Sequence, residues 1–230
     1  MAAIAKRGTP GDLDPGEGSI TSTAVSRPKA GSGQSRRGQW RRDRILAATI
    51  RLVARNGGRG TSLAEIAGEA GVTQQGLLHY FPSKDALLHA ALDVRDERDA
   101  VARDHDWQGL EFLDAIVERI GGWRAEPDMV GMFTLLLVEN LGENAPLRDR
   151  LAERYELVRK EYADAIRAAQ AAGAARRDID PDVKAIEVIA FLNGLETSWL
   201  LNPSIPVEDV AEAWAKLQRT SMAVDLQTAR

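Results

Sequence analysis

The sequence contains no cysteine among its 230 residues. This absence excludes disulfide frameworks, zinc ribbons, iron–sulfur sites and thiol catalysis, and it fits a reducing cytoplasm. No apolar run approaches the roughly 18–20 residues that a membrane helix needs. The first residues, MAAIAKRGTPGDLDPGEGS, hold no hydrophobic segment long enough for a secretory signal. We therefore expect a cytoplasmic protein with no membrane partner.

The sequence also lacks the usual catalytic motifs. It has no HExxH, GxSxG or phosphate-binding loop and only three histidines. The segment RDHDW places Asp104, His105 and Asp106 together. Adjacent residues on a helix point in different directions, so they rarely converge on one ion. We predict no enzyme activity, no metal site and no cofactor.

Charge is distributed unevenly along the chain. Residues 36–90 hold nine Lys/Arg and four Asp/Glu, a net charge of +5, whereas residues 91–230 have a net charge of −10. A compact basic segment followed by an acidic body suggests that only one part meets a polyanion such as DNA. Chance clustering of surface charge is the alternative interpretation.

Composition and periodicity predict an all-α chain behind a disordered arm. Residues 1–38 are rich in Gly, Pro, Ser and Thr, lack an apolar period, and end in the basic text SRRGQWRRDR. Such an arm could lie along DNA phosphates or be a solvated tail. From Arg41 the apolar spacing is helical, and no useful strand alternation occurs. Helices are expected from Arg41 to the Asn56 region, from Leu63, from Thr73, over 83–105, and at about 109–124, 127–142, 146–173, 182–201 and 207–226.

Two short helices between residues 62 and 81 carry the main functional signal. Ser62 with Glu65 three residues later is a capping box, and Thr73 is an N-cap residue. Gly71, which can adopt a left-handed conformation, separates the two helices. This arrangement predicts a helix-turn-helix, whose second helix enters the major groove.

The polar residues of the second helix suit base and phosphate contacts. Glutamine can donate and accept together, so it can read adenine bidentately. Gly76 gives close access to the backbone, and cationic or hydroxyl side chains can hold phosphates. The predicted DNA-binding residues are Arg41, Arg42, Ser62, Thr73, Gln74, Gln75, Gly76, His79, Tyr80 and Lys84.

The text TSLAEIAGEAGVTQQGLLHYFPSKDALL resembles the DNA-binding domain of TetR-family transcriptional regulators. It shares the Thr/Ser cap, Ile-Ala, Ala-Gly-Val, a polar recognition segment, Phe and Ser-Lys-Asp-x-Leu. Many members carry a phosphate-contacting tyrosine where this chain has Leu78, so Tyr80 or His79 is expected to replace it. Behind the arm over 1–38, the resemblance implies a DNA-binding domain over 39–84 and a ligand-binding and dimerisation domain over 85–230, with about nine helices in all.

The resemblance also implies a homodimer and a pocket for a small-molecule effector. The last two helices usually form the dimer interface, and their apolar residues suit this role: Val183, Ile186, Ile189, Ala190, Leu201, Val210, Trp214 and Leu217. The segment GGWRAEPDMVGMFTLLLVENLGE and two later helices supply apolar and polar pocket candidates: Trp123, Met129, Met132, Phe133, Leu136, Glu139, Asn140, Tyr155, Arg159, Tyr162, Asn193 and Glu196. Packing in the core is the alternative role for each apolar member.

These expectations combine into a ligand-responsive repressor that binds a palindromic operator of double-stranded DNA as a dimer. A hydrophobic or amphipathic effector would move the helix over 83–105 and change the spacing of the two recognition helices. A non-specific or architectural DNA-binding protein is the competing interpretation. Such a protein would show uniform basic charge, whereas residues 91–230 are strongly acidic.

Overall fold

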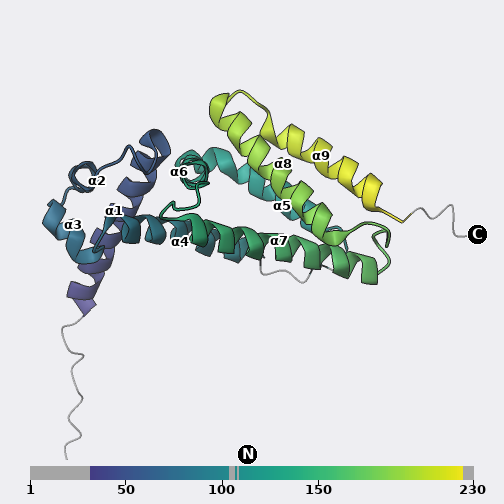
Figure 1. The fold of residues 1–230 in the computed structure, drawn as a ribbon, viewed down its shortest axis with the longest axis horizontal. Coiled ribbons are helices and arrows are strands. Elements are labelled where there is room, and N and C mark those ends of the chain that lie inside the picture. Colours follow the sequence, from purple (N-terminus) through teal and green to yellow (C-terminus); the bar gives the residue numbers. More distant parts are fainter. Residues whose placement is uncertain (1–31, 104–106, 108, 225–230) are drawn as a thin grey trace, which may run out of the picture.

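The computed structural model describes residues 32–103, 107 and 109–224 (Figure 1). Over these residues the chain is all-α, as the sequence predicts. The elements are α1 (Ser32–Asn56), α2 (Leu63–Ala70), α3 (Gln74–Tyr80), α4 (Lys84–Arg103), α5 (Phe112–Gly121), the 3₁₀ helix η1 (Gly122–Ala125), α6 (Pro127–Glu139), α7 (Arg148–Ala171), α8 (Pro181–Leu201) and α9 (Val207–Met222). Helices α1 to α3 gather at one end of the molecule, and α4 leads from them into the remaining helices (Figure 1).

The structure corrects several predicted boundaries. Helix α1 begins at Ser32, so residues 32–38, which were assigned to the arm, are helical. Helix α6 ends at Glu139 because Asn140 caps it, with its Nδ2 donating to the Leu136 carbonyl at 2.7 Å. The predicted helix over 109–124 is divided into α5 and η1. Residues 1–31 of the predicted arm lie outside the described part of the chain.

Local capping explains why α2 and α3 start where they do. The Glu65 backbone N–H donates to Ser62 Oγ at 3.2 Å, and the Ser62 N–H donates to Glu65 Oε2 at 2.7 Å. This reciprocal pair confirms the predicted capping box. The Gly76 N–H donates to Thr73 Oγ1 at 3.0 Å, so Thr73 is the N-cap of α3, also as predicted.

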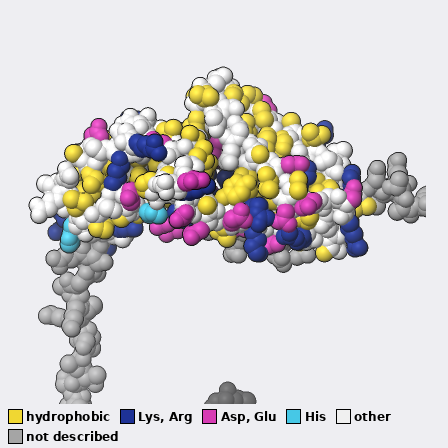
Figure 2. All heavy atoms as spheres, in the orientation of Figure 1, with side chains coloured by type: hydrophobic (Ala, Val, Ile, Leu, Met, Phe, Trp, Pro, Cys, Tyr) yellow, Lys and Arg dark blue, Asp and Glu magenta, His cyan; other side chains and the backbone are white. Residues whose placement is uncertain are grey.

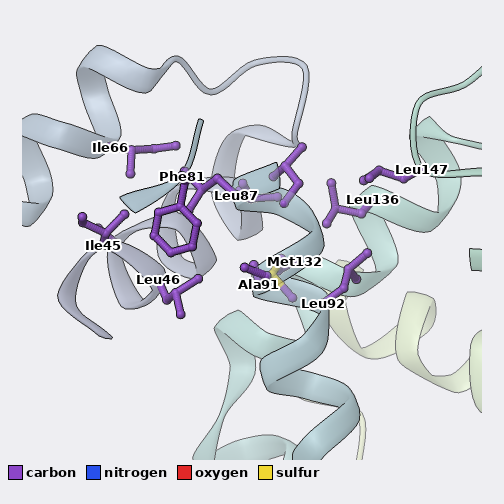
Figure 3. Close-up of a cluster of buried hydrophobic side chains, with 14 of the residues drawn as sticks. Ile45, Leu46, Ile66, Phe81, Leu87, Ala91, Leu92, Met132, Leu136 and Leu147 are labelled. Carbon is purple, nitrogen blue, oxygen red and sulfur yellow. The ribbon is translucent and has the colours of Figure 1, made fainter. Parts of the chain in front are cut away.

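Two hydrophobic cores organise the described chain. The first joins α1 to α4 with α6 and the start of α7, and Figure 3 shows Ile66 and Phe81 in the same cluster as Leu136 of α6. The second joins α5, α7, α8 and α9. Because the first core extends past residue 84, the end of the helix-turn-helix is not a boundary between separate cores. Helix α1, against which α2 packs, is also packed directly on α6.

Candidate nucleic-acid interface and ligand cavity

The helix-turn-helix depends on a tight turn at Gly71. This residue has φ +65°, the left-handed region that side chains resist. The Val72 N–H donates to the Ala67 carbonyl at 2.9 Å, which ends α2. Ala67 is 2% exposed where the two helices approach, and Leu77 anchors α3 in the first core with no exposed surface. The turn and the core together fix the orientation of α3.

The polar side of α3 faces solvent, as a recognition helix requires. Gln74, Gln75 and His79 are exposed, while Gly76 and Tyr80 are half-buried. The rings of His79 and Tyr80 meet edge to face, with centroids 5.6 Å apart. This contact holds the two proposed phosphate ligands beside each other at the end of the helix.

The hydroxyl groups of Ser62 and Thr73 are already used within the fold. Each accepts a hydrogen bond from the first turn of the helix that it caps. Hydrogen bonds with Ser62 lower the pKa of Glu65, and the positive charge of Lys84, which is half-buried at the start of α4, lowers it further. The hydroxyls of Ser62 and Thr73 thus serve as helix caps, and Lys84 supplies the positive charge near the start of α2.

The basic residues of α1 flank this surface. Arg41 is exposed, and the Arg42 guanidinium lies 5.4 Å from the centre of the Phe81 ring. Sequence reasoning missed Arg44, which is exposed and stacks on Trp40 at 4.8 Å. A Cβ atom added at Gly71 would lie 2.8 Å from Arg44 Nη2, so this arginine sits directly against the turn of the motif. Its membership of the basic run SRRGQWRRDR was the available signal.

Glu139 and Asn140 line a hollow of about 130 Å³ with Gly58, Arg59 and Lys84, away from the predicted Tyr155 and Asn193. The Glu139 carboxylate accepts hydrogen bonds from the backbone N–H groups of Gly58 and Arg59, and the Arg59 guanidinium donates to the Glu139 carbonyl. We call these contacts the α6 clasp. Asn140 Oδ1 accepts from the Leu147 N–H at 3.1 Å, so Asn140 joins α6 to α7. Both residues therefore connect structural elements.

Two hollows inside the remaining helices share two arginine side chains. The smaller, of about 50 Å³, includes three predicted residues, Phe133, Tyr155 and Asn193, in its lining. The larger, of about 340 Å³, includes the predicted Trp123 and Met129. Arg95 and Arg119 line both hollows. The predicted apolar residues thus meet around cations that sequence reasoning did not identify.

The other predicted pocket residues lie elsewhere. Met132 and Leu136 are fully buried in the first core, and Leu136 also lines the hollow of Glu139 and Asn140. Tyr162 lines a separate hollow with Arg119 and Asp99. Arg159 is on the surface, where it pairs with Glu156 at 2.8 Å and with Asp182. Met132 and Arg159 therefore line neither of the two hollows that share Arg95 and Arg119, and Leu136 lines the hollow of Glu139 and Asn140 instead.

Glu196 belongs to a buried ionic network beside the hollows. Its Oε1 accepts from Arg95 Nη2 at 3.3 Å and lies 3.9 Å from Arg119 Nη2. Asp99 lies 3.8 Å from Arg95 Nε and also contacts Arg154. Burial lowers the pKa of Arg95 to about 10, although Glu196 and Asp99 oppose the shift. Arg95 follows Leu88 and Ala91 at helical spacing, so its place on the buried stripe of α4 could have been read from the sequence.

Most of the predicted dimer residues are exposed apolar side chains. Val183, Ile186, Leu201 and Leu217 are exposed by 46–83%, and Figure 2 shows hydrophobic side chains across the surface over α8 and α9. Ala190 is exposed, whereas Val210 and Trp214 are half-buried. The Trp214 ring stacks on Phe191 with centroids 4.2 Å apart. Ile189 departs from the prediction, because it is 6% exposed and lines the smaller hollow.

The described residues form neither a metal-binding cluster nor a membrane-spanning helix. No group of three or more acidic or histidine side chains there could hold a metal ion. The segment with Asp104, His105 and Asp106 lies outside these residues. None of the described helices combines the length and the apolar character needed to span a bilayer.

Family models match two segments of the chain. The model for bacterial regulatory proteins of the tetR family matches residues 45–91, which contain α2 and α3. The model for the C-terminal part of BetI-type transcriptional repressors matches residues 137–220, which contain α7, α8 and most of α9. The α6 clasp connects the two matched segments, because Gly58 and Arg59 lie in the first and Glu139 lies in the second.

Individual proteins agree with these matches. The chain is 28% identical over 174 residues to the HTH-type transcriptional regulator UidR of Escherichia coli K12, covering 74% of this chain and 84% of that protein. A crystal structure assigned to a TetR-family transcriptional regulator from Rhodococcus sp. is 30% identical, with a TM-score of 0.65, and covers 80% of this chain and 100% of its own. A TetR transcriptional regulator from Chloroflexus aurantiacus has the same fold, at 23% identity, a TM-score of 0.72, and 83% and 100% coverage.

Proposed function

The chain belongs to the TetR family of bacterial transcriptional regulators, and from this premise we propose how its own residues bind DNA and release it. It is a ligand-responsive DNA-binding repressor. The solvent-facing row of Gln74, Gln75 and His79 on a rigidly capped α3 carries the proposal. These side chains read base edges and phosphates of a palindromic operator, while Lys84 and the arginines of α1 hold the flanking backbone.

The charge distribution confines the DNA contact to one end of the molecule. Residues 36–90 carry a net charge of +5, and residues 91–230 carry −10. The duplex repels the acidic body, so the protein contacts DNA through its basic end. This supports residues 39–84 as the DNA-binding part and 85–230 as the ligand-binding and dimerisation part, even though one hydrophobic core crosses the boundary. Because the proposed binding target is chromosomal DNA, we place the protein in the bacterial cytoplasm.

We propose that α8 and α9 pair with the same helices of a second copy. Leu201 and Leu217 are 83% and 64% exposed. Clustered apolar side chains in contact with water are unfavourable for a monomer and mark an interaction surface. A two-fold dimer places two α3 helices about one turn of DNA apart and so matches a palindrome.

We further propose that α6 transmits the state of the ligand cavity to the DNA-binding end. Phe133 and Leu137 line the smaller hollow, and Glu139 of the same helix clasps the loop after α1. Occupancy of the cavity that shifts α6 therefore moves α1 and, through the first core, α3. Helix α4, which we expected to carry the signal, also contributes Arg95 to the cavity. Release requires that the effector bind the shifted state more tightly.

The experiment that tests this function is a selection of bound sequences from random duplex DNA with the purified full chain. A specific regulator recovers one motif and prefers it over random DNA by about 10³-fold or more. An architectural DNA-binding protein recovers no motif and binds all duplexes alike. Recovery of no motif at either low or moderate salt contradicts the proposal.

A further inference from the structure

The small hollow is distinguished by the sign of its charges. The charged side chains that line it, among the described residues, are Arg95, Arg119 and Arg154, and no carboxylate is among them. We propose that the effector is an amphiphilic carboxylate whose anionic group lies against Arg95 and Arg119. This inference rests on the proposed ligand-responsive function and adds the chemical class of the ligand.

Arg95 offers an unused donor at the centre of this site. Its side chain is 7% exposed, its Nη2 pairs with Glu196 at 3.3 Å, and its Nε lies 3.8 Å from Asp99. Its third nitrogen, Nη1, is buried and has no hydrogen-bond partner. A buried guanidinium N–H without an acceptor is unfavourable, and an incoming carboxylate oxygen removes that cost. Burial lowers the pKa of Arg95 to about 10, and a bound anion would oppose this shift.

Arg119 is loosely paired in the same place. Its Nη2 lies 3.9 Å from the Glu196 oxygen that Arg95 already uses. One carboxylate oxygen is thus shared by two cations, so neither receives a bidentate partner. Arg154 forms ion pairs with Asp96, at 2.9 Å between Nη1 and Oδ1, and with Asp99. Neither of these two carboxylates lines the small hollow. The charges nearest to a ligand there are therefore positive, and a cationic ligand would be repelled.

The adjoining larger hollow provides room for an apolar body. It measures about 340 Å³, within the roughly 300–1,000 Å³ typical of small-molecule sites. Trp123, Met129 and Val130 line it, and Asp99 and Glu126 are its carboxylates. Glu126 is paired with Arg98, and Asp99 contacts Arg95 and Arg154. Because Arg95 and Arg119 line both hollows, an anion held by them can carry an apolar group into the larger space.

The aromatic ring of Phe133 explains how such a ligand would be sensed. The Arg95 guanidinium lies 3.3 Å from the centre of this ring, and Arg154 lies 5.3 Å from it. A carboxylate that draws Arg95 toward itself weakens this stacking. Phe133 is on α6, six residues before the clasp residue Glu139. The anion is thus placed where it can displace the helix that holds the DNA-binding end.

The proposal is tested by isothermal titration calorimetry of the full chain with three ligands of one shape and different charge. These are 4-phenylbutyrate, 4-phenylbutanol and 4-phenylbutylammonium at neutral pH. We expect the carboxylate to bind at least about tenfold more tightly than the alcohol, and the ammonium to bind most weakly. Equal or tighter binding of the alcohol or the ammonium overturns the proposal, as does absence of carboxylate binding at millimolar concentration.

A matched pair of arginine variants locates the effect. Arg119→Gln should reduce carboxylate affinity to that of the alcohol, whereas Arg159→Gln, on the surface of α7, should leave it unchanged. Circular dichroism checks that each variant is folded, and the wild-type series decides the matter if Arg119→Gln is not. Equal loss in both variants, or no loss in a folded Arg119→Gln, overturns the assigned site.

Calorimetry without DNA separates this inference from the proposed function. If the carboxylate binds but leaves the selected operator bound, the ligand class stands and the proposed release mechanism fails. If the chain selects an operator yet binds no carboxylate, the DNA-binding function stands and the ligand class is wrong.

Discussion

The Glu139 carboxylate at the end of α6 accepts a hydrogen bond from the Gly58 backbone N–H across 81 residues of sequence, at 2.8 Å. Gly58 has little spare room, because a Cβ atom there would lie 2.7 Å from Leu136 Cδ2. The neighbouring Arg59 N–H also donates to Glu139, and its guanidinium donates to the Glu139 carbonyl at 2.7 Å. The loop after α1 is therefore fastened to α6 from two directions.

Removing this carboxylate should loosen the DNA-binding end without destroying it. In Glu139→Ala the two loop N–H groups lose a charged acceptor, and we expect the free energy of unfolding to fall by about 1–2 kcal/mol. Chemical denaturation measures this change. Hydrogen exchange at the Gly58 and Arg59 amides should accelerate strongly in the variant. Glu143→Ala, at an exposed position just after α6, is the control and should change neither quantity. Amides that stay protected in Glu139→Ala would show that the clasp has no role.

Two glycines of the helix-turn-helix should respond to alanine in opposite ways. Gly71 has φ +65°, and a Cβ atom there would lie 2.8 Å from Arg44 Nη2. Gly71→Ala should therefore lower the free energy of unfolding by about 1–2 kcal/mol. Gly68 is inside α2 with open space around its Cα, so Gly68→Ala should raise it by about 0.5–1 kcal/mol. Thermal or chemical denaturation of both variants checks the signs. Equal effects would contradict the assigned turn.

Lys84 should contribute to affinity without contributing to sequence preference. It stands at the first position of α4, next to the DNA-facing helix. Lys84→Ala should weaken binding to all duplexes about equally and reduce the slope of log affinity against log salt by about one for each protomer. Lys160→Ala, on the exposed face of α7, should leave the slope unchanged. Titrations at several salt concentrations measure both. A changed base preference in Lys84→Ala would assign it a different role.

The apolar surface of α8 and α9 should hold two copies together. Leu217 is 64% exposed on α9. If it is buried between copies, Leu217→Glu places a charge in an apolar interface and should shift the mass in solution from twice 25.1 kDa toward 25.1 kDa. Val138→Glu, equally apolar and exposed on α6, is the matched control and should stay dimeric. Light scattering after size exclusion measures the mass. An unchanged mass in Leu217→Glu would place the interface elsewhere.

The sequence predicted best what depends on neighbouring residues. The caps at Ser62 and Thr73 are short-range patterns, and the structure confirms both. The start of α1 was missed because SGQSRRG has no apolar period from which a helix could be inferred. The exposed row on α3 followed from the same local reasoning, since a two-turn helix has one side against the core.

Long-range contacts were beyond sequence reasoning. Arg95 and Glu196 pair across 101 residues, and Glu139 meets Gly58 across 81. No periodicity in either segment indicates its partner. Met132 and Phe133 are adjacent in sequence and both belong to the first core, yet of the two only Phe133 lines the smaller hollow. The family resemblance implied a cavity and the composition of α6 suited its lining, but only the packing of α4, α5, α6, α7 and α8 determined which residues line it.

The most direct test of the central claim is to repeat the selection from random duplex DNA with Gln74→Ala beside the wild-type chain. Gln74 is exposed at the first position of α3 and is proposed to read one base pair in each half-site. The wild-type chain should select an inverted repeat with half-sites about one DNA turn apart. The variant should lose preference at one position in each half, symmetrically, at a cost of about 1–3 kcal/mol for that base pair. Identical motifs from the two proteins would contradict the assignment of α3 as the helix that reads the operator.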